Sequence, residues 1–154
     1  MPFPAAKPHA MNIWKKLFSE DSKADEVDYY QEGLDLLRVA KYHDALVSFR
    51  LALKQAPGDT AVLQQMAITH TRIGMTDEAA KTYRQVLERD ATAAGAHYGL
   101  AFLLLRSGRR DEAERHLRTF LELAPPGPEA QQHIEHARQT LSELEAGASV
   151  DGQG

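Results

Sequence analysis

The sequence of 154 residues contains no cysteine, which excludes disulfide bonds and thiolate metal sites. No apolar run approaches the roughly 18 residues that a membrane-spanning helix needs. The formal net charge of −4 lacks the basic excess expected of a nucleic-acid-binding protein. There is also no phosphate-binding glycine loop and no arrangement of a nucleophile, a base and an orienting group. These absences argue against an enzyme, and no cofactor is expected.

Histidine is the one residue type whose number suggests a metal site, with seven in the chain. His133 and His136 are three residues apart near the C-terminal end, a spacing that zinc ligands can use on a helix. No cysteine joins them, and Glu129 and Glu135 are ordinary acids for a helix surface. We therefore predict no metal site.

The dominant pattern is a 34-residue repeat that occurs three times without gaps, over residues 26–59, 60–93 and 94–127. The copies share an alanine column, a bulky apolar column four residues later, a leucine column and an arginine column. These columns are Ala45, Ala79 and Ala113; Phe49, Tyr83 and Leu117; Leu53, Leu87 and Leu121; and Arg38, Arg72 and Arg106. Self-similarity at a period of this length is typical of stacked-repeat proteins.

Each repeat divides into two helical halves. Gly74 and Gly108 end the first half of the second and third repeats, because glycine readily adopts the left-handed conformation that closes many helices. Ala40 stands in the same place in the first repeat, so that turn is the least clearly marked. Small residues in the alanine column let the two helices approach closely. Neither helix can bury its apolar stripe alone, and stacking of neighbouring pairs is expected to bury it.

The segment before the repeats, residues 1–23, contains three prolines near its start and is expected to be flexible. A short amphipathic stretch at 11–18 lacks the unbroken apolar core of a secretory signal. It is too short to bind a membrane firmly alone, so we favour a cap on the first repeat or a partner contact over peripheral membrane contact or an unstructured tail. The candidate N-terminal anchor residues are Ile13, Trp14, Leu17 and Phe18.

The chain after the repeats is polar. Pro128 is a favourable first residue for a helix, and residues 128–145 are rich in glutamine, glutamate, alanine and arginine. A polar helix of this kind suits the exposed end of a stack. We predict a capping helix at 128–145 and a disordered tail at 146–154.

The three repeats resemble the tetratricopeptide repeat, a family in which 34 residues fold as an antiparallel helix pair. The second repeat departs from the family pattern with Ala91 in place of the closing proline, and the third has Phe120 at a usually small position. The resemblance implies an all-α, right-handed solenoid of three helix pairs, which the C-terminal helix caps. The first repeat supplies every consensus residue: Tyr29, Gly33, Ala45, Phe49, Ala52 and Pro57.

In that family the first helix of each pair lines a concave groove. One inward position is apolar in every repeat of this chain, as Leu34, Ile68 and Phe102, and another is always arginine. We expect the groove to bind an apolar peptide segment whose acidic flanks meet the arginines. The candidate groove residues are Tyr30, Leu34, Leu37, Arg38, Gln64, Ile68, Thr71, Arg72, Tyr98, Phe102, Leu105 and Arg106.

The groove pattern also has explanations that need no partner. Arginine in the last turn of a helix is favourable against the helix dipole without a ligand. The apolar column can instead be covered by the chain's own N-terminal segment or by a second copy. Three functions follow: an adaptor or scaffold that binds a partner peptide, a small secretion-type or assembly chaperone, and a scaffold that self-assembles by docking its N-terminal segment into a neighbour's groove. We expect a cytoplasmic protein that binds no nucleic acid.

One binding mode of the family is disfavoured. Some tetratricopeptide proteins hold the C-terminal carboxylate of chaperones with lysine, asparagine and arginine side chains of three repeats. The matching positions in this chain carry none of these types; they are Tyr30, Leu34, Gln65, Gly95 and Gly99.

Overall fold

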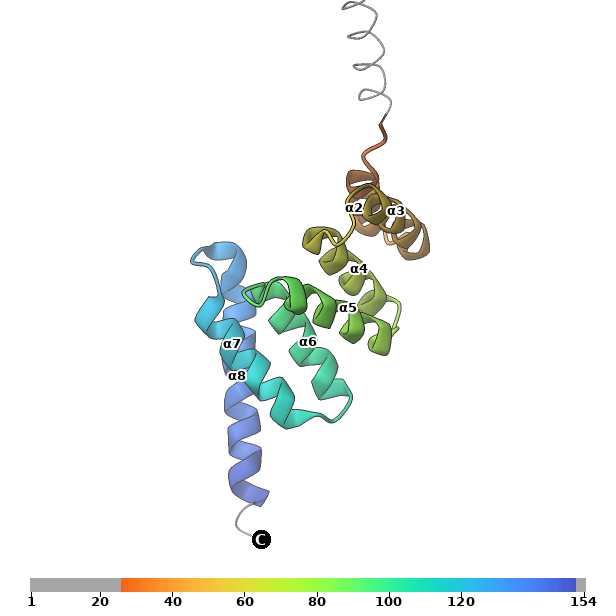
Figure 1. The fold of residues 1–154 in the computed structure, drawn as a ribbon. Helices are drawn as coiled ribbons and strands as arrows, with labels where there is room; N and C mark the ends of the chain where they lie inside the picture. Colours follow the sequence, from red (N-terminus) through yellow and green to blue (C-terminus); the bar gives the residue numbers. More distant parts are fainter. Residues whose placement is uncertain (1–25, 152–154) are drawn as a thin grey trace, which may run out of the picture.

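The computed structural model describes residues 26–151, where the chain forms seven helices and no strand. Figure 1 shows that consecutive helices pair and then pile up from the N-terminal to the C-terminal end of the stack. The all-α prediction is confirmed. The helices are α2 (Tyr29–Arg38), α3 (Tyr42–Gln55), α4 (Thr60–Arg72), α5 (Thr76–Arg89), α6 (Ala94–Arg106), α7 (Arg110–Leu123) and α8 (Pro128–Asp151).

Contacts between the helices follow the three repeats. Within each repeat the two helices pack on each other, and the second helix then packs on the first helix of the next repeat. The first helices of successive repeats also contact one another, α2 with α4 and α4 with α6, so they lie side by side along the stack. In the described part of the chain, no helix is both long enough and apolar enough to cross a lipid bilayer.

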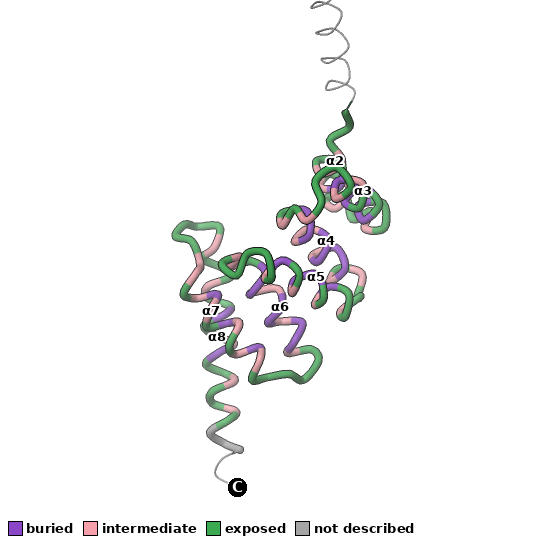
Figure 2. The backbone as a smooth tube through the Cα atoms, viewed as in Figure 1, coloured by how far each residue is buried: buried purple, intermediate pink, exposed green. Residues whose placement is uncertain are grey.

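The buried core reproduces the sequence columns. Ala45, Ala79 and Ala113 are each fully buried, and the bulky residues four positions later are buried beside them. Gly33 permits the closest approach of α2 to α3, because a Cβ at this position would overlap the ring of Phe49. Figure 2 shows buried segments along α4 and α6 in the middle of the stack. Small residues therefore set the spacing of the helices, and large ones fill the space that remains.

The three turns inside the repeats have one geometry. Gly74 and Gly108 have φ of 79° and 74°, and Ala40 has φ of 61°. In each turn the next residue donates its backbone N–H, over 2.9 Å, to a carbonyl of the last helical turn. The first repeat thus closes as the others do, although its alanine is in a conformation that favours glycine.

The C-terminal helix α8 packs on the third repeat through Ala137 and Leu141, which are both buried. It continues to Asp151, past the predicted end at Glu145, so the prediction of a disordered tail is wrong for residues 146–151. Alanine favours helix, and Arg110 Nη2 donates to the carbonyl of Leu144 over 3.3 Å, which holds this part of α8 against α7. The segment 1–23, predicted to be flexible, and residues 152–154 lie outside the described residues.

The strained turn of the first repeat gives a stability prediction. An L side chain in the left-handed conformation costs about 1 kcal/mol, so Ala40→Gly should raise the free energy of unfolding by about that amount. Gly74→Ala should lower it by a similar amount, because an added Cβ there meets nothing within 4 Å and only the backbone conformation changes. Urea denaturation followed by circular dichroism measures both. A loss of stability in Ala40→Gly would contradict the assigned turn geometry.

Candidate functional site

A groove of about 1220 Å3 lies where α6 faces α8, with α4 at one end. The helix α6 contributes Tyr98 and Phe102, which are half-buried, and α8 contributes His133 and His136 on the other side. Phe120 of α7 also lines the groove. The second wall exists because α8 packs on the third repeat and so places one of its faces opposite α6.

Aromatic rings in van der Waals contact form one side of this groove. The ring of Tyr98 lies 4.8 Å from that of Phe102, 5.0 Å from that of Phe120 and 4.8 Å from that of His133, measured between centroids. Phe102 and His136 are stacked, with centroids 4.4 Å apart and an angle of 7° between planes. Such contacts fix the rings in place, so an entering apolar side chain meets a preformed surface.

A hydrogen bond ties the two walls together. Tyr98 Oη lies 2.7 Å from His136 Nδ1. Burial raises the pKa of Tyr98, so its hydroxyl stays protonated at neutral pH and can donate this bond. The contact joins α6 to α8 directly and sets the width of the groove at this point.

The groove has a basic end. Arg72 and Arg106 occupy the last turns of α4 and α6, line the groove and are exposed. Neither forms an ion pair with an acid of residues 26–151, whereas their equivalent Arg38 pairs with Asp35 over 3.3 Å. One acid, the exposed Glu129, also lines the groove. The two arginines are therefore available to carboxylates of another molecule.

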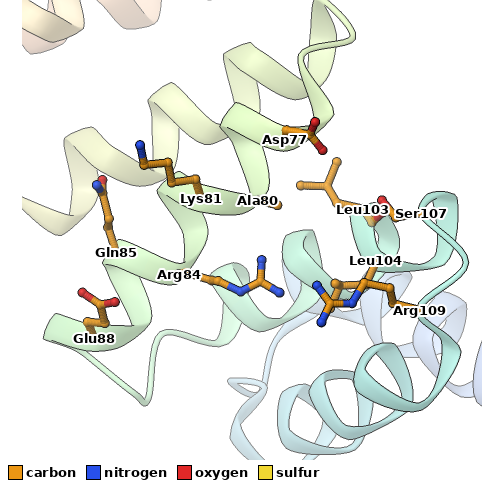
Figure 3. Close-up of a pocket in the computed structure, with 10 residues that line it drawn as sticks. All are labelled: Asp77, Ala80, Lys81, Arg84, Gln85, Glu88, Leu103, Leu104, Ser107 and Arg109. Carbon is orange, nitrogen blue, oxygen red and sulfur yellow. Dashed lines mark hydrogen bonds between the residues drawn. The ribbon is translucent and has the colours of Figure 1, made fainter.

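A second hollow, of about 530 Å3, lies between α5 and α6 and includes Arg109 of the following turn. Figure 3 shows Arg84 and Arg109 pointing toward one another across it. Both arginines bind Glu112, over 2.7 Å and 2.9 Å, and the hydrogen bond from Arg84 lowers the pKa of this carboxyl. Because its facing cations already share a carboxylate, this hollow joins two repeats and is a weaker candidate for binding.

Comparison with known proteins agrees with this geometry. A family model described as tetratricopeptide repeat matches residues 74–135, which include α6, α7 and the start of α8. Residues 74–135 of the chain are therefore tetratricopeptide repeat sequence. The TPR repeat-containing thioredoxin TTL4 of Arabidopsis thaliana is 31% identical over 102 residues, which are 66% of this chain. The chain spans only 15% of the length of that relative.

Solved structures share the fold of this tetratricopeptide repeat protein. The Yersinia enterocolitica type III secretion chaperone SycD, in complex with a peptide of the translocator YopD, is 21% identical with a TM-score of 0.73, covering 78% of this chain and 92% of SycD. PcrH in complex with the chaperone-binding region of PopD is 20% identical with a TM-score of 0.70, covering 82% of this chain and 93% of PcrH. At this identity the likeness establishes the fold.

The predicted tetratricopeptide groove residues fall into two groups. Those of the second and third repeats line the groove, except Gln64, whose amide lies against Gly95. Those of the first repeat do not line it. Tyr30, Leu34 and Leu37 pack against the core of the first repeat, and Arg38 is exposed beside Asp35. The residues that line the groove are Ile68, Thr71, Arg72, Tyr98, Phe102, Leu105 and Arg106.

Several groove residues were missed by the sequence analysis. They come from α8, from the connection before it, from the second helices α5 and α7, and from further positions of α6. The spacing of His133 and His136 marked one face of a helix, but nothing in the sequence indicated that this face meets Tyr98 and Phe102. The N-terminal anchor residues lie outside the described residues. The missed lining residues are Tyr83, Ala94, Gly95, Gly99, Leu103, Phe120, Pro125, Glu129, Ala130, His133 and His136.

The carboxylate clamp of some tetratricopeptide proteins has no room here. A Cβ at Gly99 would overlap the ring of Tyr83, which is buried and whose pKa burial raises to about 12. At Gly95 a Cβ would approach Gln64 Oε1 to 3.1 Å. A side chain at Gly99 would have to displace the ring of Tyr83, and one at Gly95 would require Gln64 to move, so the clamp side chains do not fit this arrangement.

A histidine pair supports the third repeat beside the groove. His97 Nε2 lies 2.8 Å from the carbonyl of Ala91, which can only accept, so this nitrogen carries a proton. His97 Nδ1 is 2.9 Å from His116 Nδ1, and in neutral His97 it accepts a hydrogen bond from His116. Burial lowers the pKa of His116, and the neighbouring His97 lowers it further. The pair therefore joins α6 to α7 best when His116 is neutral.

This pair predicts a pH dependence of stability. Because the pKa of His116 lies below its usual value of 6.5 in the folded chain, the unfolded chain binds the proton more readily. The stability that depends on neutral His116 should be fully present above pH 6.5. It should be lost as the pH falls from 6.5 toward the lower pKa of the folded chain. Urea denaturation at a series of pH values should show a smaller fall in His116→Gln. His70, whose pKa burial also lowers, keeps its own contribution in that variant.

The matched control for the pH series is His43→Gln, which changes an exposed histidine of α3. Its pH dependence should follow that of the unmodified chain. An equal effect of the two substitutions would contradict a role for the pair of His97 and His116 in the pH dependence of stability.

Proposed function

We propose that this tetratricopeptide repeat protein binds a short segment of a partner protein in the groove between α4, α6 and α8. The observation that carries the proposal is the combination of an aromatic wall, at Tyr98 and Phe102, with two arginines at one end that form no ion pair within residues 26–151. Tetratricopeptide structures with similar folds hold peptides of YopD and PopD, which supports a peptide as the ligand.

The lining defines the chemistry of this segment. An apolar or aromatic side chain would contact Phe102 and Ile68, and each 100 Å2 of apolar surface removed from water contributes about 2.5 kcal/mol. An acidic residue in the same segment would reach Arg72 or Arg106, whose planar guanidinium groups bind carboxylates in a two-pronged geometry. An apolar peptide with at least one acidic residue therefore fits better than a basic or a purely polar one.

A chaperone role is the second candidate. SycD is described as a type III secretion chaperone bound to a peptide of the translocator YopD, PcrH is bound to the chaperone-binding region of PopD, and this chain matches most of the length of each. In such a role the groove would cover an apolar segment of a protein before its assembly or export. We further infer that the chain works in the cytoplasm and without catalysis of its own.

Self-assembly through the groove is disfavoured by charge. The amphipathic stretch 11–18 carries Lys15 and Lys16 and no acid, and the groove ends in Arg72 and Arg106. Docking this stretch into a neighbour's groove would bring like charges together, which costs binding energy.

Substitution of the apolar wall tests the proposal. A peptide that binds the chain is first selected from a random-sequence library. Phe102→Glu and Ile68→Glu should each lower its affinity at least about tenfold, because a carboxylate replaces the apolar contact surface. The control is Val47→Glu, at an exposed valine of α3. Fluorescence anisotropy of the labelled peptide measures affinity, and circular dichroism checks the fold. Affinity retained in both groove variants would remove the groove assignment.

The basic end of the groove, formed by Arg72 and Arg106, leads to a separate prediction. The affinity for an acidic peptide should fall with rising salt concentration, since exposed charges are screened. Arg72→Glu should weaken binding and flatten this dependence. The matched control is Arg89→Glu, at an exposed arginine of α5 that does not line the groove. Equal salt curves for the unmodified chain and Arg72→Glu would show that Arg72 does not meet the ligand.

A further inference from the structure

The first helix of the stack has an open side. A shallow hollow of about 690 Å3 lies along α2, and we call the side chains that line it the α2 face. Val27 and Val39 are 48% and 63% exposed, and α2 contributes no buried residue besides Gly33. In Figure 2 this helix is mostly exposed or intermediate, whereas α4 and α6 carry several buried residues. The α2 face consists of Val27, Asp28, Gln31, Glu32, Asp35, Leu36, Val39 and Lys41.

Comparison of the repeats shows that, within residues 26–151, the α2 face lacks the helix that covers its equivalents. The positions of Glu32, Asp35 and Leu36 recur 34 and 68 residues later, and all six equivalents are buried. They are buried because the second helix of the preceding repeat packs on α4 and on α6. Among residues 26–151 no repeat precedes α2, so its stacking side stays exposed. The six buried equivalents are Met66, Thr69, His70, Leu100, Leu103 and Leu104.

The α2 face differs from its equivalents in chemistry. Three acids, Asp28, Glu32 and Asp35, line the same hollow as the apolar residues Val27, Leu36 and Val39, and of the three only Asp35 pairs with a base of residues 26–151, Arg38. Lys41 is the one basic residue of the face. A segment that covers it must therefore bring apolar side chains together with positive charges.

The amphipathic stretch 11–18 of the same chain has this composition. It carries five large apolar residues, two adjacent lysines and no acid. Residues 19–25 connect it to α2, and a segment of that length spans up to about 25 Å when extended. The ten residues of α2 extend over about 15 Å, so the stretch can reach the whole face of its own chain.

We propose that residues 11–18 bind the α2 face of their own chain, in the place that the second helix of a preceding repeat would occupy. Lys15 and Lys16 meet the carboxylate of Glu32, which forms no ion pair within residues 26–151, and the large apolar residues cover Val27, Leu36 and Val39. The binding closes the N-terminal end of the stack and leaves the groove at the other end free. It does not depend on what the groove binds.

Trp14 reports this binding directly, because it is the only tryptophan of the sequence. In the full chain its fluorescence should be shifted to shorter wavelength and resist quenching by acrylamide. Glu32→Lys should shift the emission to longer wavelength and restore quenching. Glu32 is exposed, so this variant should fold, which circular dichroism checks. The control is Glu122→Lys, the same change at an exposed glutamate of α7, which should leave Trp14 protected.

Reversal of both charges distinguishes a direct contact from an indirect effect. Lys15→Glu with Lys16→Glu should expose Trp14, and adding these changes to Glu32→Lys should return its protection. Trp14 emission typical of water in the unmodified chain, or protection that Glu32→Lys leaves unchanged, would overturn the proposal. Protection that appears only as the protein concentration rises would assign the α2 face to a second copy and would also overturn it.

Discussion

The close approach of two helices at a fully buried alanine is the contact on which the rest of the structure depends. Ala45, Ala79 and Ala113 leave no room between the helices, and the bulky residue four positions later fills the space beside each. A single pair built this way still exposes apolar side chains, which the next pair must cover. Because the spacing repeats every 34 residues, the same side of every first helix is brought to one side of the stack, and in the second and third repeats this side forms one wall of the groove.

The two ends of the stack differ, and both candidate binding surfaces follow from that difference. At the C-terminal end α8 covers the third repeat and places His133 and His136 opposite Tyr98 and Phe102, which closes a groove. At the N-terminal end the stacking side of α2 remains open and acidic. The ion pairs distinguish arginines that hold the fold together from arginines that can meet a ligand. Arg84 and Arg109 share Glu112, whereas Arg72 and Arg106 have no acidic partner among residues 26–151.

The sequence predicted what depends on the repeat and missed what depends on packing outside it. Gly74 and Gly108 marked the turns, and the 34-residue columns placed Ile68, Arg72, Phe102 and Arg106 together. The polar sequence of α8 did not indicate which face of this helix packs on the third repeat, so its contact with Tyr98 could not be predicted. Leu34 shares the column of Ile68 and Phe102 but does not line the groove, because the groove closes only where α8 supplies a second wall.

The most direct test of the groove is a map of backbone amide NMR shifts as a library-selected peptide binds the full chain. Stacking of the repeats predicts that the largest changes occur in α4, α6 and the first half of α8, around Ile68, Tyr98, Phe102 and His133. Changes concentrated in α3, α5 and α7, with α6 and α8 unaffected, would contradict a binding groove at the meeting of the third repeat and the C-terminal helix.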